Sequence, residues 1–147
     1  MAEQEEPLLD AFIDVYMNSL KYLDEFVSEP AKAFHLSFEQ YLILQEITRH
    51  QNVTLMDIAS QRQVTRSAIS RQIKVLLRQG YLRQTPDEND RRRLYLLATP
   101  AGVEAERLIR QRITRRFQGW VDVYGEERAR EILRFIRDFS QVTRMKK

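Results

Sequence analysis

TLMDIASQRQVTRSAISRQIKVLLRQGYLRQTPDENDRRRLYLLAT, residues 54–99, is the stretch that decides the fold of this chain. It opens with a short helix, predicted over 54–61 and followed by a turn. A second helix is predicted over about 65–79, and Gly80 closes it because glycine readily adopts the left-handed conformation found just after a helix. A short helix, a turn and a longer helix in succession predict a helix-turn-helix.

The second helix has two contrasting faces. Ile69, Ile73, Leu76 and Leu77 recur at helical spacing and predict an apolar stripe that faces the core. Residues 61–83 contain no Asp or Glu, but they contain six basic residues, which are Arg62, Arg66, Arg71, Lys74, Arg78 and Arg83. A run of charges is often only a solvated face. The absence of acids and the arginine-rich segment that follows nevertheless favour nucleic-acid binding.

The second helix of a helix-turn-helix enters the major groove of DNA with its N-terminal half. Arg can bond a guanine edge bidentately there, and Ser is short enough to let the helix approach. The residues expected to touch base edges or adjacent phosphates are Arg66, Ser67, Ser70 and Arg71. Lys74 is expected to touch phosphate or only to be solvated. Thr54 and its neighbouring N–H groups are a candidate for holding a phosphate at a helix N-terminus.

A β-hairpin is predicted directly after the helix-turn-helix. Residues 81–85 and 94–97 read as two short strands, and the segment PDENDRRR between them is a polar tip rich in arginine. A helix-turn-helix followed by such a hairpin is a winged helix. The tip of the wing can reach DNA phosphates or the adjacent minor groove, where Arg is favoured.

At these residues the chain resembles the MarR family of bacterial transcriptional regulators. The matching residues are Ser70-Arg71, Leu76 and Gly80 of the second helix, Asp90-Arg91-Arg92 of the wing, and Thr99-Pro100-Ala101-Gly102 after it. The flanking helices fit as well, so the resemblance covers nearly the whole chain. Ala98 departs from the family pattern, which usually has Leu at that position.

The resemblance also implies roles for the wing residues. Asp90 is expected to be structural and to hold the tip by pairing with an arginine. Arg92 is then the candidate for the minor groove, while Arg91 and Arg93 contact the DNA backbone or pack against the wing. Which of the three arginines points outward stays open, because neighbouring strand residues face opposite sides.

The expected fold is mainly α with a small β-hairpin wing, in one MarR-like domain over residues 1–147. The winged-helix DNA-binding lobe is predicted over 32–99. Two flanking regions, 8–29 and 100–145, carry wide apolar faces at helical spacing, and Glu29-Pro30 is predicted to end the first helix. These faces suit either an intramolecular core or a subunit interface. The resemblance implies that they are dimerisation helices.

Composition excludes several other classes of protein. The chain has no cysteine, which rules out disulfides, thiolate metal sites and the cysteine-based peroxide sensing of one branch of the family. Its two histidines show no ligand spacing, so no metal is expected. No catalytic or cofactor-binding motif is visible, and no membrane span or secretory signal, so a cytoplasmic protein that is neither an enzyme nor cofactor-dependent is expected.

The predicted function is sequence-specific binding of double-stranded DNA by a homodimeric transcriptional regulator. The resemblance favours a repressor on a pseudo-palindromic operator, relieved by a small apolar or aromatic effector whose binding residues are unknown. Tyr16, Met17, Leu20, Phe34, His35, Phe38 and Tyr41 are apolar or aromatic candidates that core packing explains equally well. The alternative is a winged-helix protein-interaction module with only non-specific DNA binding.

Overall fold

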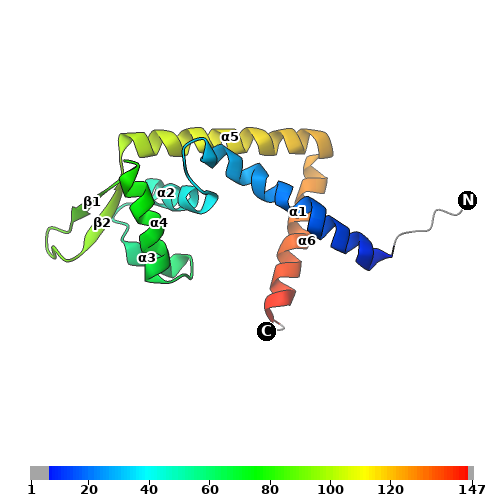
Figure 1. Ribbon diagram of the computed structural model, residues 1–147, viewed down its shortest axis with the longest axis horizontal. Helices are drawn as coiled ribbons and strands as arrows, with labels where there is room; N and C mark the ends of the chain where they lie inside the picture. The colour runs from blue at the N-terminus through cyan, green and yellow to red at the C-terminus, as the bar shows by residue number, and fades with distance from the viewer. Residues whose placement is uncertain (1–6, 146–147) are drawn as a thin grey trace, which may run out of the picture. The chain divides into compact units, whose positions relative to one another are not determined.

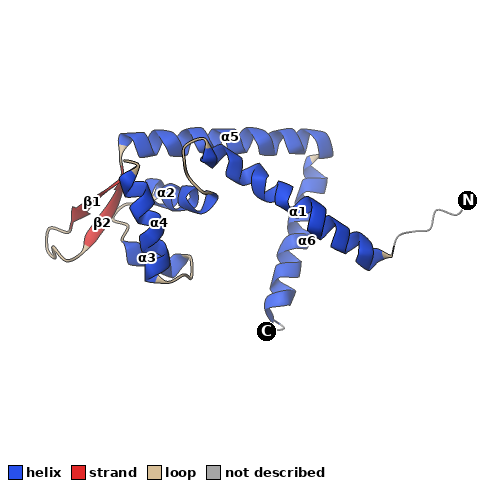
Figure 2. Ribbon diagram, viewed as in Figure 1, coloured by secondary structure: helices blue, strands red, loops and turns tan. Residues whose placement is uncertain are grey.

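A computed structural model describes residues 7–145 of the chain. Within that range its elements are α1 (Leu8–Lys32), α2 (Phe38–Arg49), α3 (Leu55–Gln61), α4 (Arg66–Arg78), β1 (Leu82–Pro86), β2 (Leu94–Ala98), α5 (Pro100–Tyr124) and α6 (Glu126–Met145) (Figure 1). Helices dominate and the strands form one hairpin, which confirms the predicted fold class (Figure 2). The chain divides into two compact units, residues 1–110 and 111–147.

The first unit has a core to which α2, α3, α4, β2 and the first part of α5 contribute. Its largest fully buried side chains are Ile43, Leu44, Ile58, Ile69, Ile73, Leu76, Leu96 and Ile109. Of the apolar stripe predicted on the second helix of the helix-turn-helix, Ile69, Ile73 and Leu76 belong to this core. Leu77 was predicted to face the core as well, but it is only half-buried and lines a surface pocket with Arg71 and Lys74. Burial of such side chains contributes about 1.5–3 kcal/mol each, so α4 is held mainly by its apolar face.

Side-chain caps define where the helices of the lobe begin. Ser37 and Gln40 form a reciprocal capping box at the start of α2, and Thr54 and Asp57 form another at the start of α3. Thr65 accepts a hydrogen bond from the N–H of Ala68 at the start of α4. Each of these caps satisfies N–H groups that lack a partner inside the helix, so the three helices begin at defined residues.

The end of the first helix differs from the prediction. The sequence predicts an end at Glu29, but α1 continues through Pro30 to Lys32. Pro30 and Ala31 are buried against the rest of the first unit, and this packing offsets the missing N–H of proline. The linker to α2 is correspondingly shorter, and it contains His35 in the left-handed conformation with φ 59°. The two strands differ from their predicted bounds by no more than one residue at either end.

The wing and the start of α5 meet at the turn after α4. Gly80 has φ +77°, the left-handed conformation expected of a glycine after a helix. Thr99 donates its N–H to the carbonyl of Tyr81 at 3.0 Å and its hydroxyl to the carbonyl of Gly80 at 2.6 Å. A Cβ atom on Gly102 would lie only 2.0 Å from the carbonyl oxygen of Tyr81. Glycine is therefore required there because two backbones approach closely.

The hairpin pairs β1 with β2 in an antiparallel register that places Leu82 opposite Ala98 and Gln84 opposite Leu96. Val53 forms an isolated bridge with Leu96, so the small additional strand that a winged helix can carry is reduced here to one residue pair. Leu96 is 2% exposed, so its side chain packs the hairpin against the core.

The second unit contains the end of α5 and all of α6. Phe117, Trp120 and Tyr124 follow one another along α5 with ring centroids 5.9 and 5.7 Å apart. Arg128 of α6 lies over the ring of Tyr124. Several large apolar side chains of α6 are exposed, and Phe135, at 68%, is one of them.

Candidate nucleic-acid interface

The side of α4 opposite the core carries most of the predicted contacts. Arg66, Ser67, Arg71 and Lys74 are exposed, and Ser70 is half-buried. Ile69 and Ile73 on the opposite side are at most 2% exposed. The first turn of α4 contains no acidic residue. The helix therefore presents basic and hydroxyl groups outward while its apolar stripe fixes its rotation about its own axis.

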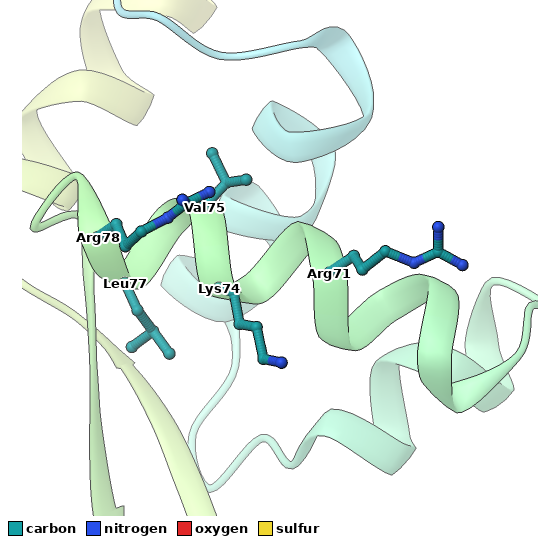
Figure 3. A pocket seen from close by; sticks show the side chains of 5 residues that line it. All are labelled: Arg71, Lys74, Val75, Leu77 and Arg78. Carbon is teal, nitrogen blue, oxygen red and sulfur yellow. The ribbon is translucent and has the colours of Figure 1, made fainter.

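Figure 3 shows the middle and C-terminal part of this surface. Lys74 and Leu77 leave α4 on one side, Val75 and Arg78 leave it on the other, and Arg71 extends farther toward the N-terminal end. These five residues line a pocket on α4. Because their side chains diverge, the pocket is an open part of the basic helix surface and does not form an enclosed ligand cavity. Arg78, which the sequence analysis placed only in the basic window, belongs to the same surface.

A second hollow brings together residues from α3, α4 and both strands of the wing. It has a volume of about 440 Å³, and its lining residues are Thr54, Leu55, Met56, Asp57, Arg66, Gln84, Arg92, Arg93, Leu94 and Leu96. Thr54 precedes α3, Arg66 begins α4 and Arg92 lies in the wing. Three residues predicted separately from the sequence thus line one hollow between the helix-turn-helix and the wing.

Thr54 is already part of a hydrogen-bonded group in this hollow. Its N–H donates to Asp57 Oδ2 at 2.9 Å, and its Oγ1 accepts from the N–H of Asp57 at 3.2 Å. These hydrogen bonds hold the pKa of Asp57 below its usual value, so the carboxylate is charged at neutral pH. The hydroxyl of Thr54 can still donate one hydrogen bond, but any phosphate it met would lie near this negative charge.

The tip of the wing is organised by two aspartates. Asp90 accepts a hydrogen bond at Oδ1 from the N–H of Arg92 at 3.1 Å. Asp87, which the sequence reasoning missed, accepts at Oδ1 from the N–H groups of Asn89 and Asp90, at 2.7 and 3.2 Å. Asp87 also accepts a hydrogen bond from the hydroxyl of Tyr95. The signal in the sequence was the Pro-Asp pair at the end of the first strand, because Asp readily bonds backbone N–H groups two residues on.

These hydrogen bonds shift two pKa values. The Tyr95 hydroxyl, followed by the two N–H groups, lowers the pKa of Asp87. The same contact raises the pKa of Tyr95, because ionisation would remove the donated proton. At neutral pH the carboxylate and the protonated phenol therefore form a matched pair at the base of the tip.

The three wing arginines are not equivalent. The guanidinium of Arg93 lies 5.7 Å from the centroid of the Tyr95 ring. It also lowers the pKa of both Asp57 and Asp87, although it is not the main cause for either. Arg93 is thus the one of the three whose guanidinium lies over the Tyr95 ring, near the carboxylates of Asp57 and Asp87. Arg91, Arg92 and Arg93 are all exposed.

The two histidines stay apart from any cluster of metal ligands. His35 lies in the turn after α1, and His50 is 3.3 Å from Glu46 of α2. Among residues 7–145, no group of three or more His, Cys, Asp or Glu side chains could hold a metal ion. Over the same residues, no helix is both long and apolar enough to cross a membrane.

In this structure α4 buries an apolar side and exposes a basic side, and a hairpin with exposed arginines follows it. These features define a winged-helix DNA-binding protein. Comparison with known proteins gives the family. Residues 36–93 match the model of the MarR family. The HTH-type transcriptional regulator YwhA of Bacillus subtilis is 30% identical over 109 residues, which cover 74% of this chain and 76% of the relative.

Two solved structures show the same fold. The MepR–DNA complex of Staphylococcus aureus has a TM-score of 0.71 at 19% identity, covering 94% of this chain and 99% of that one. The Staphylococcus aureus MarR in complex with salicylate and kanamycin has a TM-score of 0.70 at 20% identity, covering 95% and 91%.

This chain belongs to the MarR family and is a transcriptional regulator with a DNA-binding helix-turn-helix. Proteins of this family are DNA-binding regulators and not enzymes, so the prediction that the chain lacks catalytic activity is confirmed.

Proposed function

We propose that the protein is a homodimeric repressor that binds a pseudo-palindromic operator in the cytoplasm. Each protomer places α4 in a major groove and its wing beside the adjacent minor groove. Two-fold symmetry then separates the half-sites by about one helical turn, ~10 bp. Occupation of the operator blocks the promoter.

The observation that carries this proposal is the hollow where Thr54, Arg66 and Arg92 come together. A duplex that runs along the basic face of α4 would pass this hollow before it reached the wing. In this proposal Arg66, Ser67, Ser70 and Arg71 contact base edges or neighbouring phosphates, and Lys74 contacts phosphate. Arg92 enters the minor groove and Arg91 contacts the DNA backbone. Asp90 holds the tip.

The proposed dimer rests on apolar side chains that the single chain leaves exposed. On α1 they include Phe12 at 57%, Tyr16 at 59% and Leu23 at 56%. On α6, Phe139 is 55% exposed. Faces of this kind mark protein interfaces, because monomeric proteins rarely expose large contiguous apolar areas. We therefore assign residues 8–29 and 100–145 to dimerisation and 32–99 to DNA binding.

The proposed effector is a small apolar or aromatic molecule. The support is salicylate, an aromatic molecule, which is one of the two ligands in the structure of the Staphylococcus aureus MarR with salicylate and kanamycin. An effector relieves repression only if it binds one dimer geometry more tightly than the other. Among the candidate residues, Tyr41 is 3% exposed and belongs to the core, whereas Met17 is 66% exposed.

Fluorescence anisotropy tests the proposal. The wild-type protein is used to select duplexes from a randomised pool of synthetic DNA. The selected duplex and a scrambled version of it are then titrated across a salt series. At physiological salt, a sequence-specific regulator should bind the selected duplex at least about a thousandfold more tightly than the scrambled duplex. If nothing is enriched, or if both duplexes bind equally and lose affinity together as salt rises, the attraction is to phosphate alone. That result would favour the protein-interaction module instead.

A further inference from the structure

We infer that Glu39 and Gln40, consecutive residues in the first turn of α2, are positioning residues for DNA recognition. Glu39 holds Arg62 at the end of α3, and Gln40 holds Gln72 in the middle of α4. Arg62 then acts as an anchor of the helix-turn-helix and does not contact DNA, although it lies in the basic window. The inference rests on the proposed function, because positioning matters only if the protein reads DNA sequence.

The first contact joins α2 to the turn of the helix-turn-helix. Arg62 Nε donates to Glu39 Oε1 at 2.6 Å, and Arg62 Nη2 donates to Glu39 Oε2. Such a bidentate ion pair fixes the orientation of the guanidinium relative to the carboxylate as well as their distance, because both groups are planar. The side chain of Arg62 is 26% exposed, so the pair is only partly open to water.

The backbone of Arg62 is also engaged, since its N–H donates to the carbonyl of Ile58 at 3.0 Å as the C-cap of α3. The backbone of Arg62 is thus fixed at the end of α3, and its side chain ties that end of the helix to Glu39 of α2.

The second contact joins α2 to α4. Gln40 Oε1 accepts the N–H of Ser37 at 2.9 Å, and Gln40 Nε2 donates to Gln72 Oε1 at 2.9 Å. One amide group thus caps α2 and holds the recognition helix at the same time. Gln72 is half-buried, whereas its neighbour Arg71 is exposed on the proposed DNA side.

These two contacts form a bracket, defined here as Glu39–Arg62 together with Gln40–Gln72. A base contact is a hydrogen bond that works only between about 2.7 and 3.2 Å, so a shift of roughly 1 Å in α4 abolishes it. Attraction to phosphates falls off much more slowly with distance. Loss of the bracket should therefore reduce binding to the selected duplex while leaving binding to the scrambled duplex nearly unchanged.

The charge of Arg62 offers a second, independent readout. An arginine that touches phosphate releases a counterion, and its removal lowers the slope of log affinity against log salt by about 0.9 for each phosphate that is no longer neutralised. An arginine bound to Glu39 makes no such contribution. The salt slope of Arg62→Gln should therefore match that of the wild-type protein, in contrast to Arg66→Gln, which serves as the matched control on the exposed face of α4.

The experiment titrates full-length wild type, the single variants Arg62→Gln, Glu39→Gln, Gln72→Ala and Arg66→Gln, and the double variant E39Q/R62Q with both duplexes across a salt series. The thermal transition of each free protein is recorded, and titrations are run well below it. Arg62→Gln, Glu39→Gln and Gln72→Ala should each lower the ratio of selected to scrambled affinity by about tenfold. Arg62→Gln should keep the wild-type slope. The double variant E39Q/R62Q should lose no more than either single variant, since the two side chains act as one pair.

Two results would overturn the inference while leaving the proposed function intact. One is a slope for Arg62→Gln that falls as far as that of Arg66→Gln, which would place Arg62 on phosphate. The other is an unchanged affinity ratio in folded Arg62→Gln and Glu39→Gln proteins. A wild-type protein that itself fails to discriminate between the duplexes would instead remove the proposed function, and the inference with it.

Discussion

Replacement of Gly102 by alanine tests the junction between the recognition helix, the wing and α5. The added Cβ would lie 2.0 Å from the carbonyl oxygen and 2.9 Å from the carbonyl carbon of Tyr81. A carbon and an oxygen normally approach no closer than about 3.3 Å, so the two backbones must separate by roughly 1.3 Å. Neither side can relieve this by a change of rotamer, because the atoms of Tyr81 that clash belong to the main chain.

The expected cost follows from what this separation disturbs. Overpacking of this kind costs about 1–3 kcal/mol. The same movement strains the two hydrogen bonds from Thr99 to the carbonyls of Gly80 and Tyr81, each worth about 1 kcal/mol. We expect Gly102→Ala to lower the free energy of unfolding by about 2–4 kcal/mol, and Tm by about 4–16 °C. The turn also joins α4 to β1, so affinity for a selected duplex should fall as well.

Gly119→Ala is the matched control because Gly119 lies in the same helix and a Cβ atom added to it would meet nothing within 4 Å. Alanine is favoured over glycine inside a helix by about 0.5–1 kcal/mol, so this variant should be slightly more stable than the wild type. Circular dichroism melting of the two variants gives shifts of opposite sign if the reasoning is right. A Gly102→Ala protein as stable as Gly119→Ala would show that the close approach to Tyr81 does not exist in solution.

Four further outcomes are expected. Arg71→Ala should cost about 1–3 kcal/mol on a selected duplex if it reads a base, and an equal loss on scrambled DNA would show contact with phosphate only. Arg92→Ala should weaken DNA binding without changing Tm, and unchanged affinity would exclude its wing role. Phe12→Glu should raise the dimer dissociation constant about tenfold or more in sedimentation equilibrium, because it places a charge where the proposed dimer buries an aromatic side chain. The lowered pKa of Asp87 stabilises the wing above pH about 3.8, and this contribution is lost as the pH falls through the lower folded value. The protection factors of the wing amides, which are corrected for the intrinsic exchange rate at each pH, should therefore fall in acid in wild type, while Asp87→Asn should lack this pH dependence.

Much of the fold was predictable because its causes are local in the chain. The spacing of Ile69, Ile73 and Leu76 indicates which side of α4 is buried, whatever the partner is. Thr54 and Asp57 cap a helix three residues apart, and Gly80 ends one by its own backbone freedom. Hydrophobic period, capping and glycine conformation each act within a few residues, so the sequence displays them directly.

Other features were not predictable because they depend on residues far apart in the chain. Proline at position 30 predicts a helix end, and only the burial of Pro30 and Ala31 explains why α1 runs on to Lys32. The hydrogen bond between Asp87 and Tyr95 requires the hairpin to close in its observed register.

Arg62 and Arg66 are both arginines of one basic window, and neither composition nor spacing distinguishes them. Chain order and local chemistry were enough to identify a helix-turn-helix, a wing and a DNA-binding charge pattern. Tertiary structure alone decided which charges face outward, because it brings Glu39, 23 positions earlier, against Arg62 and leaves Arg66 exposed. An arginine that already forms an ion pair with a carboxylate contributes little to binding a DNA phosphate. The ion pair between Arg62 and Glu39 forms only once α2 has packed against the end of α3.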